Sequence, residues 1–345
     1  MSNSGPLILI TGGTGFIGNH TVAQFLSHGY RVRATARNKD SCSRLLAIHD
    51  KHRESIETHV ITDITLPGAF DQAVKGVDGI VHMASPFTYS ITDNEKDLII
   101  PAINGTRRIL ESTVSFAPQV KRVVLTSSFA SIVDFSQGLW PGHVYDETQW
   151  NPITFQAAKD DKRGLAYAGS KKLAEQAAWE FTKTTAGVNF SLATINPPMV
   201  YGPPFPGSAN LRHLGQSASE IYALMNGSVT AVPPTTLPAF VDVRDVAKAH
   251  RLAFETDQPQ RFLVSGGSFD MQQVCDLLRE NIPKLKSRVP IGNPGHESVG
   301  EHYLIDCSKA RNVLGIEFLP FSSTFLDMAD TFMQLEELEK TPASV

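Results

Sequence analysis

A glycine-rich segment near the amino terminus, TGGTGFIG at Thr11–Gly18, constrains the fold of this 345-residue chain more than any other feature. It lies between the short apolar run Leu7–Thr11 and a helical pattern over Phe16–His28. At such a junction, glycines permit a tight turn, a close approach of backbone to a pyrophosphate, and packing of helix on sheet. The N–H groups that begin the helix favour an anion. The segment therefore predicts a dinucleotide site formed by Gly12, Gly13, Thr14, Gly15, Phe16, Ile17 and Gly18.

The first two-thirds of the chain alternates short apolar runs with helical patterns, including a long helix expected over Gly164–Thr185. Short strands separated by helices predict βαβ units and a parallel sheet that is covered on both faces. The expected fold is α/β, with a Rossmann-type doubly wound parallel sheet. Its further strands are expected at Arg31–Ala36, Thr58–Thr62, Gly79–Ala84, Arg122–Thr126, Phe190–Ile195 and Arg261–Ser265.

The pattern changes after Asn196, where the chain becomes rich in Pro, Gly and Ser up to Pro238. Long loops of this kind in a compact protein are usually functional. We expect a nucleotide-binding domain of residues 1–196 and 240–266. A smaller, mixed C-terminal substrate lobe is expected from residues 197–239 and 267–335, and residues 336–345 form a frayed tail.

Composition and charge exclude some classes of binding partner. The chain is 41% hydrophobic and 19% charged with a net charge of −4, which does not suit a nucleic-acid binder. No stretch approaches the roughly 18 apolar residues of a membrane span, and the first residues lack an export signal. Cys42, Cys275 and Cys307 stand far apart, so neither a metal site nor a disulfide framework is indicated. We expect a cytoplasmic protein with a small-molecule substrate, as a monomer or a homodimer.

The end of the second strand bears on the choice between NAD and NADP. In RVRATARNKD, Arg37 stands where an acid would bind the ribose 2′-hydroxyl, and Arg44 follows a little beyond. A guanidinium can bind a 2′-phosphate through two donors, so NADP(H) is the expected cofactor. The alternative is a basic strand end in solvent, which suits Arg33 better than Arg37. Asp63, next to Ile64, follows the third strand and could accept from the adenine amino group; a helix cap is a comparable interpretation.

A Y-x-x-x-K pair, Tyr167 and Lys171, lies on the expected long helix, where i, i+4 spacing puts both side chains on one face. A phenol is an ineffective acid–base group at neutral pH, and a nearby ammonium favours the phenolate. The pair alone also occurs by chance on amphipathic helices. However, VVLTSSFAS at 123–131 is an apolar strand that ends in hydroxyls, where ligands of such sheets bind. A hydroxyl there can stabilise a developing oxyanion.

These segments resemble one known superfamily. TGGTGFIG, RATAR, HMASP, VVLTSS, YAGSKKLAEQAAW and INPPMVYGP, in this order, are similar to the extended short-chain dehydrogenases/reductases. They most resemble the dihydroflavonol 4-reductase branch, which includes cinnamoyl-CoA reductases and fungal NADPH-dependent aldehyde and ketone reductases. FVDVRDVAKAH, at Phe240–His250, is particularly similar to the fungal members. The resemblance extends from about residue 5 to beyond residue 260 and is loose in the C-terminal lobe.

The resemblance implies a catalytic triad of Ser128, Tyr167 and Lys171, in which Ser128 is the second serine of TSS. It also implies that Arg37 contacts the 2′-phosphate and Asp63 the adenine. Asn104 matches a place where many relatives keep a proton-relay Asn, although some in this branch do not; a surface Asn on a helix is the alternative. Further cofactor contacts are expected from Ile64, Met83, Ala84, Ser85, Thr126, Pro197, Met199 and Val200.

The implied reaction is NADPH-dependent reduction of a ketone or aldehyde with Tyr167 as the proton donor, as in a ketoreductase of fungal secondary metabolism. Variable segments offer Phe87, Phe129 and Tyr201 as substrate contacts, although these side chains could instead pack the lobes together. Two other functions stay open. A nucleotide-sugar epimerase or dehydratase of the same superfamily is disfavoured by Arg37, and a non-catalytic NADP-binding sensor is disfavoured by the complete triad.

Overall fold

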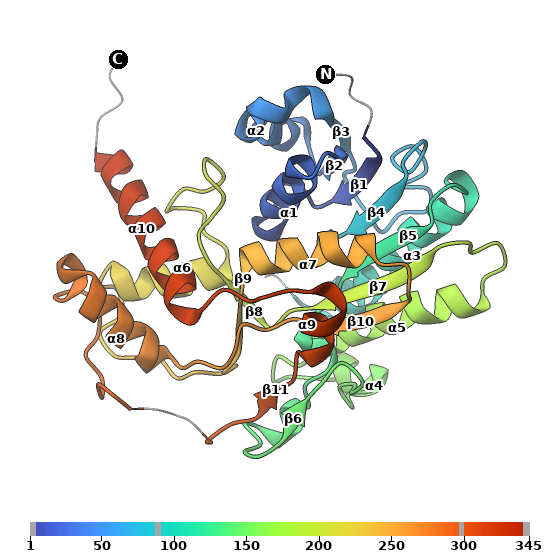
Figure 1. Cartoon of the computed structure of the whole chain (residues 1–345). Coiled ribbons are helices and arrows are strands. Elements are labelled where there is room, and N and C mark those ends of the chain that lie inside the picture. The colour runs from blue at the N-terminus through green and yellow to red at the C-terminus, as the bar shows by residue number, and fades with distance from the viewer. Residues whose placement is uncertain (1–4, 87–90, 297–299, 341–345) are drawn as a thin grey trace.

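Seven parallel strands form one sheet in the computed structural model, which describes residues 5–86, 91–296 and 300–340 (Figure 1). The spatial order is β10-β7-β5-β4-β1-β2-β3, and each neighbouring pair is parallel. The expected α/β fold with a Rossmann-type sheet is confirmed. The strands are β1 (Leu7–Thr11), β2 (Arg31–Ala36), β3 (Ile56–Val60), β4 (Gly79–His82), β5 (Arg122–Thr126), β7 (Ser191–Asn196) and β10 (Gln260–Leu263).

The strand order reverses between β1 and β4. The chain runs outward from β1 to β2 and β3, and then returns to pair β4 with the other edge of β1, so that Thr11 lies opposite His82. In open parallel sheets the ligand crevice lies outside the carboxyl ends of the strands at this reversal. The fold therefore directs a nucleotide to the segments that follow Thr11 and His82.

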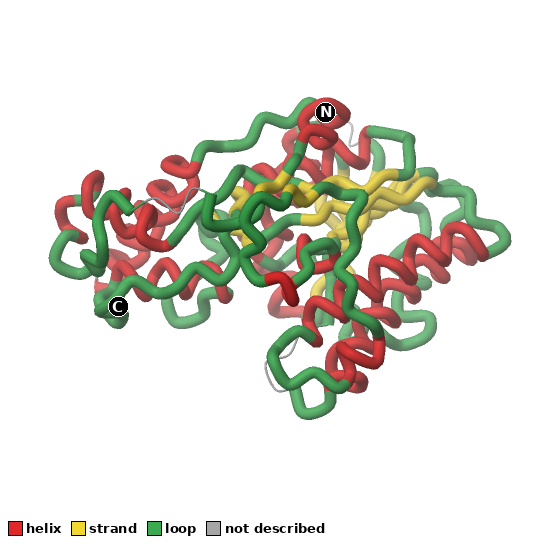
Figure 2. The backbone as a smooth tube through the Cα atoms, turned by 90° about the horizontal axis from the view of Figure 1, so that it is seen from below, coloured by secondary structure: helices red, strands yellow, loops and turns green. Residues whose placement is uncertain are grey.

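Helices cover both faces of the sheet. Figure 2 shows the sheet as one twisted layer. Ile8 and Ile10 of β1 belong to a buried cluster that also includes residues of α1 (Phe16–Ser27) and α7 (Val243–Glu255). Leu7 and Leu9 belong to a second cluster, with residues of α3 (Ile100–Phe116) and α5 (Ala166–Thr184). Because both faces are buried, β1 is a continuous apolar run without polar alternation.

A smaller lobe, on the left of Figure 1, contains α6 (Gln216–Met225), α8 (Met271–Asn281) and α10 (Phe321–Lys340). These helices enclose a separate apolar cluster in which Tyr201, Phe240, Phe269 and Phe325 contact one another. A short parallel pair, β8 (Met199–Tyr201) and β9 (Phe240–Asp242), joins this lobe to the sheet. The sequence pattern did not indicate the pairing of β8.

The chain returns to the main sheet after it has built most of the lobe. Ala310 and Leu314 of α9 (Ser308–Leu314), together with Ile316, pack in the same cluster as α1 and α7. The expected lobe, 267–335, included this segment. We therefore propose a division into the two expected bodies, with residues 308–316 assigned to the nucleotide-binding domain, because their apolar side chains are buried there. The expected tail, 336–345, was placed too early: helix α10 (Phe321–Lys340) includes residues 336–340, and Glu336 pairs with Arg288 of the lobe.

Among the described residues, no helix has the length and hydrophobicity needed to cross a bilayer, and no group of three or more His, Cys, Asp or Glu could hold a metal ion.

Short elements complete the fold. The remaining elements are α2 (Lys39–Ile48), η1 (Asp50–Ser55), η2 (Glu95–Ile99), η3 (Phe129–Ser131), η4 (Phe135–Gln137), β6 (Val144–Tyr145), α4 (Phe155–Lys159), η5 (Pro283–Leu285) and β11 (Leu304–Ile305).

Candidate active site

The glycine turn between β1 and α1 has the geometry that a pyrophosphate requires. Gly12 has a φ of +69°, and its carbonyl oxygen accepts from the N–H of Gly15 at 3.1 Å. A Cβ on Gly18 would lie 2.2 Å from that carbonyl oxygen, so no larger residue fits there without displacing the turn. No side chain among the described residues caps α1, whose first N–H groups are therefore available to an anion. The turn fits a dinucleotide.

Asn19, which the sequence analysis did not single out, holds this turn from inside α1. Its Nδ2 donates to the carbonyl oxygens of Thr14 and Gly15, each at 3.1 Å. Its Oδ1 lies 3.3 Å from Nε2 of His49, which is buried and belongs to the C-terminal end of α2. Asn19 directly follows Gly18, so a polar residue beside the last glycine of the motif was the available signal.

The segment after β4, which belongs to the HMASP motif, lies against the glycine turn. The Oγ1 of Thr11 accepts from the N–H groups of Met83 and Ala84, at 3.1 and 3.0 Å. These bonds end β4 at His82, two residues earlier than expected, because the two N–H groups no longer serve a neighbouring strand. A Cβ on Gly12 would lie 3.1 Å from the Ala84 nitrogen, which shows how closely the two segments approach.

His82 is a buried, neutral anchor beneath these segments. Because the Thr11 hydroxyl already accepts two N–H groups, its own hydrogen goes to Nδ1 of His82, 2.8 Å away. Burial, with the positive charge of Lys171, lowers the pKa of His82 to about 3. The imidazole therefore remains uncharged at neutral pH and keeps the ends of β1 and β4 together.

Three arginines near β2 have different environments. Arg33 donates to the Glu57 carboxylate at 2.7 and 2.9 Å and also to two backbone carbonyls, so the protein uses its donors internally. Arg37 is exposed at the end of β2, and Arg44 is exposed on α2, where it donates to Ser41 at 3.1 Å. The structure thus leaves Arg37, not Arg33, accessible for a 2′-phosphate.

Asp63 and Ile64 lie beyond the end of β3. One carboxylate oxygen of Asp63 accepts from the hydroxyl and the N–H of Thr65, and these bonds lower the pKa of Asp63. This contact is a turn and not a helix cap, and among the described hydrogen bonds it uses only one carboxylate oxygen of Asp63. Ile64 packs on α3, where a Cβ on Gly105 would lie 3.1 Å from its Cδ1. Asn104, the neighbour of Gly105, is half-buried on α3.

Tyr167 and Lys171 lie one turn apart on α5. Tyr167 is 39% exposed, and Nζ of Lys171 is 5.6 Å from the centroid of its ring. The same Nζ donates to Oγ of Ser85 at 3.0 Å. The structure therefore brings together a phenol, an ammonium and the segment after β4, although Ser85 and Lys171 are far apart in the chain.

The two serines after β5 have different hydrogen-bond partners. Ser127 is buried, and its hydroxyl donates to Oε2 of Glu175 at 2.5 Å. Ser128 begins the turn η3, and its Oγ accepts from the N–H of Ala130 at 3.1 Å. Within the described hydrogen bonds the hydroxyl hydrogen of Ser128 is not used, so it can be donated to a substrate oxygen. Helix α5 packs directly on η3, which brings Ser128 to the Tyr–Lys helix.

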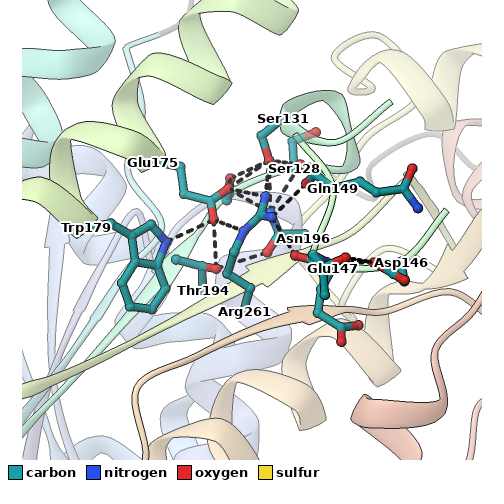
Figure 3. Close-up of polar contacts among 12 residues, drawn as sticks. Ser128, Ser131, Asp146, Glu147, Gln149, Glu175, Trp179, Thr194, Asn196 and Arg261 are labelled. Carbon is teal, nitrogen blue, oxygen red and sulfur yellow. Dashed lines mark hydrogen bonds and ion pairs between the residues drawn. The ribbon is translucent and has the colours of Figure 1, made fainter. Parts of the chain in front are cut away.

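A buried carboxylate connects this turn with α5 (Figure 3). Burial alone would favour the neutral acid, but the Arg261 guanidinium and the hydroxyls of Ser127 and Ser131 outweigh it and lower the pKa of Glu175. Sequence reasoning missed both Glu175 and Arg261. The available signals were the continuation of the Y-x-x-x-K spacing to Glu175 and a charged residue in the last apolar strand.

The remaining expected cofactor contacts surround the same edge of the sheet. The carbonyl oxygen of Pro197 accepts from the N–H of Phe129 at 2.8 Å, so Pro197 lies directly behind the Ser128 turn. Met199 and Val200 are partly exposed on β8. Oγ1 of Thr126, at the end of β5, lies 2.6 Å from Nε2 of His250, a residue of α7 that the sequence analysis did not assign.

The structure does not support two of the three expected substrate contacts. Phe129 is 1% exposed and packs on the buried rings of Tyr145 and Tyr303. Tyr201 is also 1% exposed, and its hydroxyl donates to Glu220 at 2.8 Å inside the lobe. Both rings belong to apolar clusters and not to an open pocket wall, because burial of a large aromatic side chain is strongly favourable. Phe87 lies outside the described residues.

The fold and this geometry define the class of protein. The chain belongs to the extended short-chain dehydrogenases/reductases, within the NAD dependent epimerase/dehydratase family, whose model matches residues 8–265. The family resemblance expected from the motifs is thereby confirmed.

This chain is similar to several individual proteins. It is 37% identical over 342 residues to the NADPH-dependent methylglyoxal reductase GRE2 of Saccharomyces cerevisiae, and the match covers 95% of this chain and 98% of that protein. It is 36% identical over 348 residues to the ketoreductase azaE of Aspergillus niger, covering 97% and 99%. The crystal structure of Candida albicans Gre2 in complex with NADPH superimposes with a TM-score of 0.90 at 34% identity, covering 96% of this chain and 99% of that chain.

Proposed function

We propose that this chain is an NADPH-dependent carbonyl reductase that converts a ketone or an aldehyde to the alcohol. The observation that carries the proposal is the juxtaposition of the Ser128 turn with Tyr167 and Lys171 of α5, beside the glycine turn at the carboxyl edge of the sheet. The names of the relatives, a methylglyoxal reductase and a ketoreductase, describe the same reaction class.

The residues that would hold NADPH come from several strand ends. The glycine turn and the first N–H groups of α1 would bind the pyrophosphate, and Arg37 with Arg44 would bind the 2′-phosphate. When bound, NADPH supplies the hydride for the reduction. Asp63 would accept from the adenine, and the other contacts would come from Ile64, Met83, Ala84, Ser85, Thr126, Pro197, Met199 and Val200.

The chain itself supplies the proton and the electrostatic stabilisation. The Ser128 hydroxyl donates a hydrogen bond to the carbonyl oxygen of the substrate and stabilises the negative charge that develops there. Tyr167 donates the proton to that oxygen as a general acid. The ammonium of Lys171, held by Ser85, stabilises the phenolate that remains on Tyr167. Oxidation of an alcohol would use the same groups in reverse.

Location and assembly are part of the same proposal. The three cysteines are buried thiols, a state that suits the reducing cytoplasm. The working unit is a monomer or a homodimer acting on a small molecule. A nucleotide-sugar epimerase has less support, because the accessible Arg37 favours NADP and the relatives named above are reductases.

The test is the loss of NADPH absorbance with a panel of ketones and aldehydes that includes methylglyoxal, with NADH in parallel. We expect turnover with NADPH and little with NADH. The Tyr167→Phe variant is the control for non-enzymatic oxidation. Tight binding of NADPH without turnover of any carbonyl would overturn the proposal in favour of a non-catalytic role.

A further inference from the structure

We propose that Glu175, held by Arg261, is a positioning residue that sets Ser128 in register with Tyr167 and Lys171. The inference rests on the proposed function, because it concerns the serine of that site. It assigns a role to a buried ion pair that is not among the proposed contacts to cofactor or substrate.

The first observation is the position of Glu175 on α5. Tyr167, Lys171 and Glu175 follow one another at intervals of four residues, which places them along one face of the helix. Tyr167 is 39% exposed at the site, whereas Glu175 is 1% exposed and reaches into the protein one turn beyond Lys171. Helix α5 thus carries both Tyr167, the proposed proton donor, and the buried charge of Glu175.

The second observation is that this charge holds the residues on either side of Ser128. Oε2 of Glu175 accepts from Ser127 at 2.5 Å and from Asn196 at 2.8 Å, and it lies 2.7 Å from Oγ of Ser131. Oγ of Ser131 is also 2.7 Å from the carbonyl oxygen of Ser128, which Asn196 approaches to 3.4 Å. Ser128 is therefore bracketed by side chains that depend on one carboxylate oxygen (Figure 3).

The third observation is that the carboxylate cannot rotate. Its Oε1 accepts from Arg261 at 2.6 Å, from Thr194 at 3.0 Å and from Trp179 at 3.1 Å. Arg261 in turn donates to the carbonyl oxygens of Glu147 and Gln149, and its guanidinium stacks 3.7 Å above the ring of Trp150. With both oxygens saturated by directional donors, Glu175 has one orientation.

Packing alone does not require this arrangement. An apolar pair of similar volume generally serves a protein interior as well as a buried ion pair does. What an ion pair adds is a unique geometry, here between α5 and the Ser128 turn. A misplacement of about 1 Å in a reacting group can reduce a rate about a hundredfold, so such a geometry has a direct effect on turnover.

The test is a double-mutant cycle of Glu175→Gln with Ser128→Ala, measured as kcat for the best carbonyl substrate. Glutamine keeps the size of the side chain but presents a donor to groups that are themselves donors. Alone, Glu175→Gln is expected to lower kcat at least about tenfold while the Kd for NADPH, titrated without substrate, changes less than about threefold. In the Ser128→Ala background the same change is expected to lower kcat less than about threefold, because no serine remains to position.

Arg122→Met is the matched control. Arg122 is a buried cation at the opposite end of β5, where it donates to the Ala253 and Gln258 carbonyl oxygens. Its loss is expected to lower Tm without changing kcat. If Glu175→Gln does not fold, Arg261→Lys takes its place, because lysine keeps the charge but not the fork of donors.

Equal losses of kcat in the two serine backgrounds, or a loss of Tm with unchanged kcat as for Arg122→Met, would assign Glu175 a structural role only and overturn the inference. A wild-type protein that reduces no carbonyl would instead refute the proposed function, and the inference would fall with it. The two failures are therefore distinguished by the wild-type measurement.

Discussion

Oγ1 of Thr126 lies 2.6 Å from Nε2 of His250, and Nδ1 of the same ring lies 2.7 Å from the carbonyl oxygen of Val246. A carbonyl only accepts, so Nδ1 carries the hydrogen and Nε2 accepts from the Thr126 hydroxyl. Thr126 can therefore offer only its lone pairs to a further partner. Burial lowers the pKa of His250 to about 4, which keeps the ring neutral at neutral pH.

His250→Leu should weaken NADPH binding. The change releases the hydroxyl of Thr126, which we propose as a cofactor contact, from its fixed orientation. We expect the Kd to rise about fivefold, the value of roughly one hydrogen bond, in a fluorescence titration. Thr126→Val should have a similar effect, Thr126→Ser should have little, and the double variant should be no weaker than Thr126→Val. A wild-type Kd for His250→Leu would contradict this role.

Tyr167→Phe should abolish turnover and leave NADPH binding nearly intact. The change removes only the hydroxyl, which is the proposed proton donor, and keeps the ring near the Lys171 ammonium. Loss of a general acid typically lowers kcat by about a hundredfold to ten thousandfold. The Kd for NADPH should change less than about threefold. Tyr30→Phe, at the exposed contact with Glu255, is the control and should retain wild-type kcat.

Arg37→Asp should change the cofactor preference. A hydrogen bond to a charged group contributes about 1.5–3 kcal/mol to the free energy of binding. The Kd for NADPH should therefore rise roughly tenfold or more, while the Kd for NADH is little changed. Arg33→Met is the matched control, because the donors of Arg33 are used by Glu57 and by backbone carbonyls. It should lower Tm without altering the ratio of the two Kd values. A parallel weakening of NADPH and NADH by Arg37→Asp would exclude Arg37 as the 2′-phosphate contact.

The pH dependence of stability should change in Asp245→Asn. Asp245 is 3% exposed and accepts from the Leu319 N–H at 2.7 Å, which ties α7 to the segment before α10. Burial, helped by the charge of Asp242, raises the pKa of Asp245 from 3.8 to about 6. The folded state thus binds this proton more tightly than the unfolded state does. The contribution of protonated Asp245 to the free energy of unfolding is therefore complete below pH 3.8 and is lost as the pH rises through about 6.

Asparagine can accept the same hydrogen bond without a buried charge. Relative to the wild type, Asp245→Asn should gain about 1–3 kcal/mol in the free energy of unfolding at pH 7.5 and much less at pH 4.5, measured by urea denaturation. The buried His20 and His49 act in the opposite direction, because burial lowers the pKa of each to about 4 and their contribution is lost on acidification. Comparing both proteins at each pH cancels that contribution. The same difference at the two pH values would show that Asp245 does not titrate in this range.

The sequence by itself determined the fold class, the glycine turn and the Tyr167–Lys171 pair. These features are local: a Cβ at Gly18 is excluded by a carbonyl oxygen six residues earlier, and the Tyr–Lys spacing is set by one helical turn. The continuous apolar runs of the strands likewise indicate in the sequence that both faces of the sheet are buried. The end of β4 was placed two residues late because the hydroxyl of Thr11 stops it from across the sheet.

Only the tertiary structure decided how the polar side chains around the site are divided between core and ligand. The family resemblance selected Ser128 over Ser127, but only the structure gives the physical difference: the Ser127 hydroxyl donates to Glu175, whereas the Ser128 hydroxyl can still be donated. Phe129 and Tyr201 are equally suited to a pocket or a core, and long-range packing buries both. Hydrogen bonds such as Arg261 to Glu175 join residues on separate elements, and no local pattern encodes them, because their geometry exists only after sheet and helices have packed.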